Sequence, residues 1–229
     1  MTIELPILFI KAKGTIILLN GVSSSGKTTI ANSLQNIMDA PYLIVGLDLF
    51  YNLYSKLLPK RFNPEPIPKT DSIDKGYALY CKCEIRNRKV ETFHRFIAAF
   101  SAAGNNIIVD TIIDTKHVLE NFIAILEDYP VLLVGVHCPL EELERREKAR
   151  GDRTLGLAKI QYDRLHAHTL YDVEVDTSKQ TPLECARKIT KVIEIFLKEH
   201  FLKHGKTCIK SFQMLRNNLS RFSDNRGVI

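Results

Sequence analysis

The sequence contains no apolar run approaching the roughly 20 residues that a helix needs to cross a bilayer. It also has no internal repeat and no low-complexity tract, which excludes repeat architectures. The apolar stretch at residues 3–10 contains Glu4 and Pro6 and has no basic region before it, so we expect an extra strand or an ordered arm there rather than a signal peptide. The 229 residues are therefore expected to form one globular domain with no transmembrane segment.

Cysteine is scarce, and its five residues are scattered along the chain. Only Cys81 and Cys83 lie close together, and a Cys-x-Cys pair alone does not make a zinc site. We therefore expect five reduced thiols and a cytoplasmic protein.

Basic residues are concentrated at the C-terminus. The net charge is +6, and the segment from Lys198 onward holds seven basic and two acidic residues. The rest of the chain is thus close to neutral, which argues against a surface that binds long nucleic acids.

Residues 201–229 combine this charge with apolar residues at helical spacing. The apolar positions are Ile209, Phe212, Leu215, Leu219 and Phe222. We predict a basic amphipathic tail that docks on the domain or on a second subunit. The alternative is a contact with an acidic partner or a membrane surface.

Short apolar runs alternate with helical patterns over residues 1–200, which we assign to one domain. Strands are expected at 15–20, 42–47, 106–110, 131–137 and 171–176. Helices are expected at 28–39, 90–103, 115–128, 139–150, 155–168 and 181–200. The continuously apolar middle strands indicate a parallel sheet covered on both faces. The order predicts an α/β fold, a three-layer doubly wound parallel sheet with a C-terminal helical extension.

Three segments carry further local signals. Residues 59–70 contain four prolines and are expected to be a surface loop. Residues 73–89 are ambiguous, and we interpret "YALYCKCEIRN" as a strand or part of a small hairpin. Helix 181–200 begins with a predicted capping box, in which Thr181 is the N-cap, Pro182 follows, and Glu184 closes the box.

The segment "GVSSSGKT" matches the phosphate-binding pattern G-x-x-x-x-G-K-[ST], and it lies between an expected strand and an expected helix. Small residues let backbone amides approach an anion, and Lys27 adds a point charge. We expect the amides from Ser23 to Lys27 to hold the β-phosphate, Lys27 to reach the β/γ oxygens, and Thr28 to ligate Mg²⁺. The expected cofactors are ATP and Mg²⁺, bound by Gly21, Val22, Ser23, Ser24, Ser25, Gly26, Lys27, Thr28 and Thr29.

A phosphate loop serves several classes of enzyme. The guanine-reading N-K-x-D segment of GTPases is absent from the sequence. Processive ATPases usually need a longer chain. A short chain with acidic residues at strand ends is most typical of a kinase, which must orient an acceptor hydroxyl and neutralise charge on the phosphoryl group.

Two aspartates follow expected strands. Asp48 comes just after strand 42–47, at the edge where ligands bind in open α/β sheets. It is either the base that accepts the acceptor's proton or the N-cap of the next helix. Asp110 ends strand 106–110 and is expected to hold Mg²⁺ through water or to assist Asp48, with a simple cap as the alternative.

Arginines gather in "ERREKARGDR", residues 144–153. Arg146 and Arg150 are four residues apart and share a helix face, so they can close over phosphates as catalytic groups. The alternative is a solvated face in which neighbouring glutamates pair with the arginines. The aromatic residues Phe50, Tyr51, Tyr54 and Phe62 form either an acceptor pocket wall or ordinary core packing.

Together, these segments resemble the chloramphenicol phosphotransferase-like family of P-loop kinases. The resemblance spans roughly residues 15–195 and is carried by "ILLNGVSSSGKT", "GLDLF", "NIIVD", "VGVHCPLEELERREKARGDR" and "YDVEVDTSKQTPLECARKI". It implies ATP-dependent phosphorylation of a small-molecule hydroxyl, which in the namesake is a hydroxyl of chloramphenicol. It places Asp48 at the family's proposed general base, and Arg146, Arg150 and Arg153 at its lid arginines.

The sequence also departs from the family pattern. It has Thr111 after Asp110, where the family resemblance predicts a second carboxylate. Residues 50–90 match poorly, and acceptor contacts are expected there. The alternatives to a small-molecule kinase are a kinase of a nucleotide-sugar, nucleoside or nucleic-acid end, and a nucleotide-dependent switch that acts through its tail.

Overall fold

The computed structural model describes residues 12–59, 67, 70–151, 155–165 and 171–202. Its strands are β1 (Ile16–Gly21), β2 (Tyr42–Gly46), β3 (Asn106–Thr111), β4 (Val131–His137) and β5 (Val173–Asp176). Its helices are α1 (Lys27–Ile37), α2 (Leu47–Leu57), α3 (Ile73–Lys82), α4 (Glu84–Ala102), α5 (Lys116–Leu126), α6 (Leu140–Arg150), α7 (Leu157–Leu165) and α8 (Pro182–Leu202).

The five strands form one parallel sheet in the order β2-β3-β1-β4-β5. Strand β1 lies at the centre, with Leu19 paired to Asp110 of β3 on one side and to Val134 of β4 on the other. This register brings the segment after β1 next to the end of β3. The predicted doubly wound parallel sheet is therefore confirmed.

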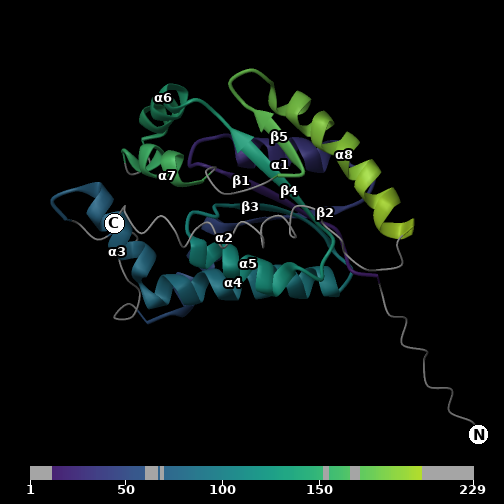
Figure 1. Cartoon of the computed structure of the whole chain (residues 1–229), viewed down its shortest axis with the longest axis horizontal. Helices are drawn as coiled ribbons and strands as arrows, with labels where there is room; N and C mark the ends of the chain where they lie inside the picture. The colour runs from purple at the N-terminus through teal and green to yellow at the C-terminus, as the bar shows by residue number, and fades with distance from the viewer. Residues whose placement is uncertain (1–11, 60–66, 68–69, 152–154, 166–170, 203–229) are drawn as a thin grey trace, which may run out of the picture.

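Helices cover both faces of the sheet, giving three layers (Figure 1). Helices α4 and α5 pack on one face around the fully buried Phe93 and Phe122. Helices α1 and α8 pack on the other face, where Ile30 and Ile189 are fully buried. The sheet is held between two apolar layers. Its carboxyl edge can therefore hold the loops that follow the strands in fixed positions.

The predicted start of α8 is correct in detail. The backbone N–H of Thr181 donates to Glu184 Oε2 at 2.8 Å, and the Glu184 N–H donates to Thr181 Oγ1 at 3.3 Å. This reciprocal pair is the capping box expected from the sequence.

The prediction of a strand or hairpin at residues 73–89 is wrong. The segment forms α3 and the start of α4, with Ser72 Oγ accepting from the Lys75 N–H at the helix start. Tyrosine is enriched in strands, which favours the strand prediction. In the structure, Tyr77 and Tyr80 follow Ile73 at helical spacing and face inward from α3. Helix α2 is a further addition to the predicted helices.

Several expectations lie outside the described residues. They concern the N-terminal arm, all but residues 59, 67 and 70 of the proline-rich loop, Arg153, and the amphipathic helix in the tail. The four cysteines in the described part, Cys81, Cys83, Cys138 and Cys185, are free thiols. None of the described helices is long and apolar enough to span a membrane.

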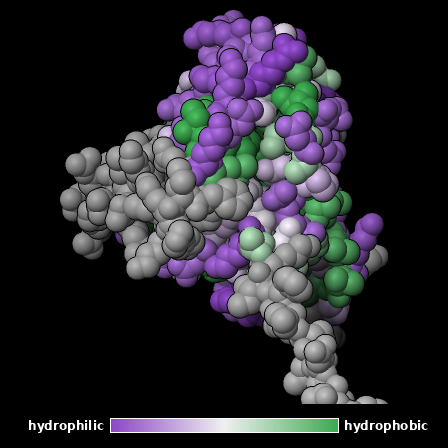
Figure 2. Space-filling model, turned by 90° about the vertical axis from the view of Figure 1, so that its right-hand side faces the viewer, coloured by the Kyte–Doolittle hydropathy of each residue, from purple (hydrophilic) through white to green (hydrophobic). Residues whose placement is uncertain are grey.

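The face that carries α8 and β2 is mixed in polarity. Figure 2 shows hydrophobic patches there, separated by hydrophilic side chains. Exposed apolar residues include Leu43 of the edge strand β2 and Ile195 of α8. Scattered exposed residues of this kind are ordinary for a folded domain.

Candidate functional site

A large cleft lies at the carboxyl edge of the sheet and has a volume of about 1470 Å³. The segments that follow β1, β2 and β3 all line it, as do α3, α4, α6 and α7. This edge is where ligands bind in doubly wound sheets. Most of the candidate residues from the sequence meet in this one place.

The phosphate loop, residues 21–28, has little room for side chains. A Cβ on Gly21 would lie 2.6 Å from Ser25 Oγ and 2.8 Å from the carbonyl oxygen of Val136. Gly26 has φ +93°, and Ser24 has φ +65°, so both adopt the left-handed conformation. The loop therefore wraps tightly around the space in front of α1.

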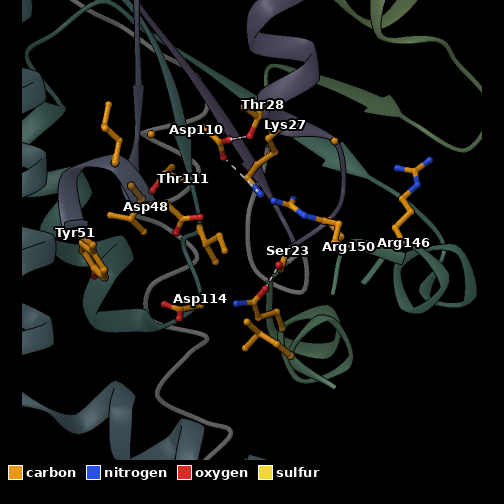
Figure 3. A pocket seen from close by; sticks show the side chains of 18 of the residues that line it. Ser23, Lys27, Thr28, Asp48, Tyr51, Asp110, Thr111, Asp114, Arg146 and Arg150 are labelled. Carbon is orange, nitrogen blue, oxygen red and sulfur yellow. Dashed lines mark hydrogen bonds and ion pairs between the residues drawn. The ribbon is translucent and has the colours of Figure 1, made fainter. Parts of the chain in front are cut away.

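Three predicted residues meet directly at the end of this loop. Lys27 Nζ donates to the carbonyl oxygens of Gly21 at 2.8 Å and Val22 at 3.0 Å, and it lies 3.6 Å from Asp110 Oδ1. Thr28 Oγ1 donates to Asp110 Oδ2 at 2.5 Å. An ammonium, a hydroxyl and a carboxylate thus share one corner of the cleft (Figure 3).

The backbone amides of the loop divide into two groups. The Ser23 N–H donates to Gln161 Oε1 at 2.9 Å, and the Ser25 N–H donates to the Val22 carbonyl at 3.2 Å. The expectation that all amides from Ser23 to Lys27 face a phosphate is therefore too broad for this structure. The first amides of an α-helix have no partner within the helix. The N-terminal amides of α1 are therefore the better candidates for binding phosphate.

Side chains of the loop contribute differently. The hydroxyls of Ser23, Ser24 and Ser25 are buried without a hydrogen-bond partner in the described structure. Val22 is 1% exposed and packs in a small apolar cluster with Leu143, so its side chain supports the loop from behind. Thr29 is exposed and lines the cleft.

Asp48 lies in the first turn of α2 and lines the same cleft. The N-cap of α2 is Gly46, so the interpretation of Asp48 as the helix cap is wrong. Figure 3 shows Asp48 and Tyr51 across the cleft from the two arginines of α6. Of the aromatic group near it, Tyr51 lines the cleft, whereas Phe50 packs on Phe93 of the core with ring centroids 5.2 Å apart.

The two arginines of α6 are held differently. Arg146 donates from Nε to Glu142 at 2.8 Å and from both Nη atoms to Thr177 at 3.0 Å. Thr177 Oγ1 in turn donates to the Ser25 carbonyl at 2.8 Å, which joins Arg146 to the outside of the loop. In Figure 3, Arg150 extends toward Lys27, whereas Arg146 points away from it.

The glutamate that anchors this group is strongly acidic. Hydrogen bonds from Arg145 and Arg146 lower the pKa of Glu142 to about 2. Arg145 itself is exposed and pairs with Glu142 at 2.7 Å. The solvated charge pairing expected as an alternative is therefore correct for Arg145.

Sequence reasoning missed a second polar cluster in the lining of the cleft. Arg86 Nη2 donates to Asp114 Oδ1 at 2.6 Å, and the Tyr77 hydroxyl donates to Asp114 Oδ2. All three side chains are buried and belong to α4, the segment after β3, and α3. Burial and then the Asp114 carboxylate raise the pKa of Tyr77 well above its ordinary value, so its hydroxyl stays protonated.

This cluster gave a weak signal in the sequence. Asp114 lies four residues after Asp110, just past a strand end, which is the kind of position at which site carboxylates occur. Tyr77 and Arg86 carry no comparable signal. They lie in the segment expected to be a strand or hairpin, and only its true helical spacing turns Tyr77 inward.

The donor set near Asp110 fits a magnesium ion. Mg²⁺ usually keeps several waters and is bound through one or two protein oxygens together with substrate phosphates. Thr28 Oγ1 and the Asp110 carboxylate provide such a pair of oxygens. No cluster of three or more acidic, histidine or cysteine ligands occurs in the part of the chain that the structure describes, and this mode of binding does not require one.

Comparison with known proteins gives a consistent result. The family model described as chloramphenicol phosphotransferase-like protein matches residues 14–194. A Mycobacterium tuberculosis protein named "Putative O-phosphotransferase Rv2636" is 30% identical over 184 residues, covering 77% of this chain and 81% of its own length.

Solved structures show the same fold at low sequence identity. The Mycobacterium tuberculosis APS kinase CysC, solved with AMPPNP and APS, has a TM-score of 0.57 and 14% identity, and covers 80% of this chain and 98% of its own. A gluconokinase from Sinorhizobium meliloti 1021 has a TM-score of 0.56 and 17% identity, and covers 85% of this chain and 99% of its own. Together with the family match, these likenesses lead to one conclusion: the chain belongs to the chloramphenicol phosphotransferase-like family and is a phosphotransferase with the P-loop kinase fold.

Proposed function

We propose that the protein transfers a phosphoryl group from ATP to a hydroxyl of a small molecule. The observation that carries the proposal is the convergence of Lys27, Thr28 and Asp110 in one corner of a cleft that Asp48 also lines. This is the set of groups that phosphoryl transfer needs, because catalysis of that reaction rests mainly on positioning and on charge stabilisation.

The nucleotide end of the cleft is the phosphate loop. The N-terminal amides of α1 and the unpartnered serine hydroxyls supply donors for phosphate oxygens. Lys27 turns from the loop carbonyls toward the β/γ oxygens and neutralises their charge. Arg150 extends toward the same place, and Arg146 holds the outer side of the loop beside the nucleotide. Arg153 is assigned to nucleotide binding from the sequence alone.

Thr28 and Asp110 would hold Mg²⁺, Thr28 through its hydroxyl and Asp110 directly or through water. When bound there, Mg²⁺ would supply positive charge that offsets the charge of the phosphate oxygens. Thr111 occupies the place of a second carboxylate, is buried and lines the cleft, so the metal-binding carboxylate here is Asp110.

Asp48 is the acceptor-side base. As the acceptor oxygen forms its bond to the γ-phosphorus, the bond from that phosphorus to the ADP oxygen breaks, and the acceptor proton passes to the Asp48 carboxylate. Lys27 and Arg150 stabilise the charge on the phosphoryl oxygens during this step. A chloramphenicol-like antibiotic is one candidate acceptor, because the chain belongs to that family.

We also propose a reducing cellular compartment such as the cytoplasm. The support is the free state of the four described thiols.

The deciding experiment measures ADP release with ATP and Mg²⁺ across a panel of hydroxyl compounds that includes chloramphenicol, nucleosides and nucleotide-sugars. The Lys27→Ala protein is the blank, since it lacks the charge that stabilises the phosphoryl group. Stimulation by one compound in the wild-type protein alone identifies the acceptor. ATP binding without any stimulated release would overturn the kinase and favour a nucleotide-dependent switch.

A further inference from the structure

A chain of buried hydrogen bonds runs along the cleft from the phosphate loop to the cluster of Tyr77, Arg86 and Asp114. The Ser23 N–H donates to Gln161 Oε1 at 2.9 Å, and Gln161 Nε2 donates to the Tyr77 hydroxyl at 3.5 Å. Tyr77 then donates to Asp114, which also accepts from Arg86. Tyr77 and Arg86 belong to residues 50–90, where acceptor contacts are expected, so we assign this cluster to the acceptor end of the cleft. The chain thus joins that end to the phosphate loop.

Each link has a fixed direction. The single hydroxyl hydrogen of Tyr77 is committed to Asp114, so the Tyr77 oxygen can only accept from Gln161. Gln161 must therefore turn Nε2 to Tyr77 and Oε1 to Ser23. The reverse orientation would place an N–H₂ group against the Ser23 N–H, two donors facing one another in a buried place. Tyr77 in this way sets the orientation of a side chain that holds the loop.

The linking residues are placed for such a role. Gln161 is 4% exposed and Tyr77 is 2% exposed, so water competes little for their bonds. Helix α7 contacts Tyr77 a second time, through the Arg164 guanidinium 5.7 Å from the ring centroid. Both linking side chains line the cleft, although neither is among the groups proposed to touch the phosphoryl group.

We propose that Gln161 and Tyr77 are positioning residues that couple the acceptor end of the cleft to the phosphate loop. A molecule that binds near Tyr77 and Asp114 then changes the affinity of the loop for nucleotide, and the nucleotide changes acceptor affinity by the same factor. The inference rests on the proposed function, in that the loop is taken as the nucleotide site.

The first test compares two phenylalanine substitutions on the same helix. Tyr77→Phe removes the hydroxyl that orients Gln161. Tyr80→Phe removes a hydroxyl from α3 in the same cleft, outside the chain of bonds. We expect Tyr77→Phe to weaken the binding of AMPPNP with Mg²⁺, measured by calorimetry, about threefold to tenfold, the effect of one hydrogen bond. Tyr80→Phe should stay within about twofold of the wild-type protein.

The second test is a double-mutant cycle with Gln161→Met, which retains volume and loses both hydrogen bonds. If Tyr77 acts through Gln161, adding Tyr77→Phe to Gln161→Met weakens AMPPNP binding no further. Additive losses would overturn the coupling, and so would wild-type affinity in Tyr77→Phe. Melting temperatures show that each variant is folded at the temperature of the calorimetry, and the double-mutant cycle then separates a positioning role from a purely structural one, because independent structural losses would add.

The outcomes for the two proposals are distinct. A wild-type protein that fails to bind AMPPNP overturns the proposed function, and the coupling with it. If the wild-type protein binds AMPPNP and the Tyr77→Phe and Gln161→Met proteins bind it equally well, the coupling is overturned and the proposed function stands.

Discussion

Gly21 shows how closely the phosphate loop is packed at the scale of one residue. An added methyl group would lie within 2.8 Å of a backbone carbonyl oxygen of β4, which cannot move without disturbing the sheet. The sequence pattern predicts a glycine here, and the structure supplies the reason, which is contact with the neighbouring strand.

Replacing Gly21 by Ala should therefore destabilise the protein by about 1–3 kcal/mol, the usual cost of overpacking. It should also weaken nucleotide binding. Chemical denaturation measures the first effect. The matched control is Gly46→Ala at the start of α2, where an added Cβ meets nothing within 4 Å. Equal losses in both variants would contradict the steric explanation.

Asp48 carries the proposed acid-base chemistry. Asp48→Asn keeps the shape of the side chain but removes the base, so turnover should fall by about 10²–10⁴-fold. ATP affinity should change little, since Asp48 is proposed to face the acceptor. Steady-state kinetics and calorimetry on the same variant separate the two quantities. Loss of ATP binding would remove Asp48 from its assigned role.

The residues of the site differ in how far sequence predicts them. Lys27 and Thr28 belong to a contiguous motif, and Asp110 follows from its place at a strand end. Tyr77 and Arg86 enter the cleft through the packing of α3 and α4, which depends on distant parts of the chain. Local patterns contain no direct record of such contacts.

At the scale of elements, the strands and the helices around them were predictable because the apolar runs are unambiguous. The capping box of α8 was predictable too, since its interactions span only three residues. Helix α3 was not, because a short segment rich in tyrosine and cysteine fits either a strand or a helix. Its inward side is fixed by a tertiary contact, the hydrogen bond from Tyr77 to Asp114 in the segment after β3.

The interface between α4 and α5 contains a buried histidine. His94 is 1% exposed, lies 2.6 Å through Nδ1 from Asn121 Oδ1, and packs against Phe122 with ring centroids 5.8 Å apart. Burial lowers the pKa of His94 to about 4. The folded protein therefore keeps this side chain neutral under conditions in which an unfolded chain protonates it.

The sign of the pH dependence follows. Between about pH 6.5 and pH 4 the unfolded chain binds a proton at His94 that the folded protein excludes, so the free energy of unfolding falls as pH falls. The contribution approaches about 1.4 kcal/mol per pH unit in that range. His94→Gln should flatten the dependence measured by denaturation, whereas the same change at the exposed His117 should leave it intact. Identical profiles for all three proteins would refute this assignment.

At the scale of the whole molecule, the charge is unevenly distributed. Residues 203–229 hold six basic residues and one acidic residue, so a chain that ends at residue 202 would carry a net charge of +1. The family match ends at residue 194, before this segment. Catalysis is therefore expected to belong to the body of the protein.

A chain shortened to residues 1–202 should fold and bind ATP within about twofold of the full chain, because the family match and all the residues proposed to bind nucleotide lie before residue 203. Calorimetry checks the affinity, and ADP release with the identified acceptor checks the activity. Normal binding with lost activity would assign a working role to the tail. Loss of ATP binding would show that the domain boundary lies further toward the C-terminus.

The position of Lys27 has a kinetic consequence. In this structure its ammonium group already bonds to the Gly21 and Val22 carbonyls and lies near Asp110. The two carbonyls and Asp110 thus compete with the phosphate chain of the nucleotide for the Lys27 ammonium group. Nucleotide binding requires Lys27 to leave these partners. Association should then show two phases in rapid mixing, a fast encounter and a slower exchange of partners by Lys27, with the slower phase absent in a protein that has no ammonium group at this position.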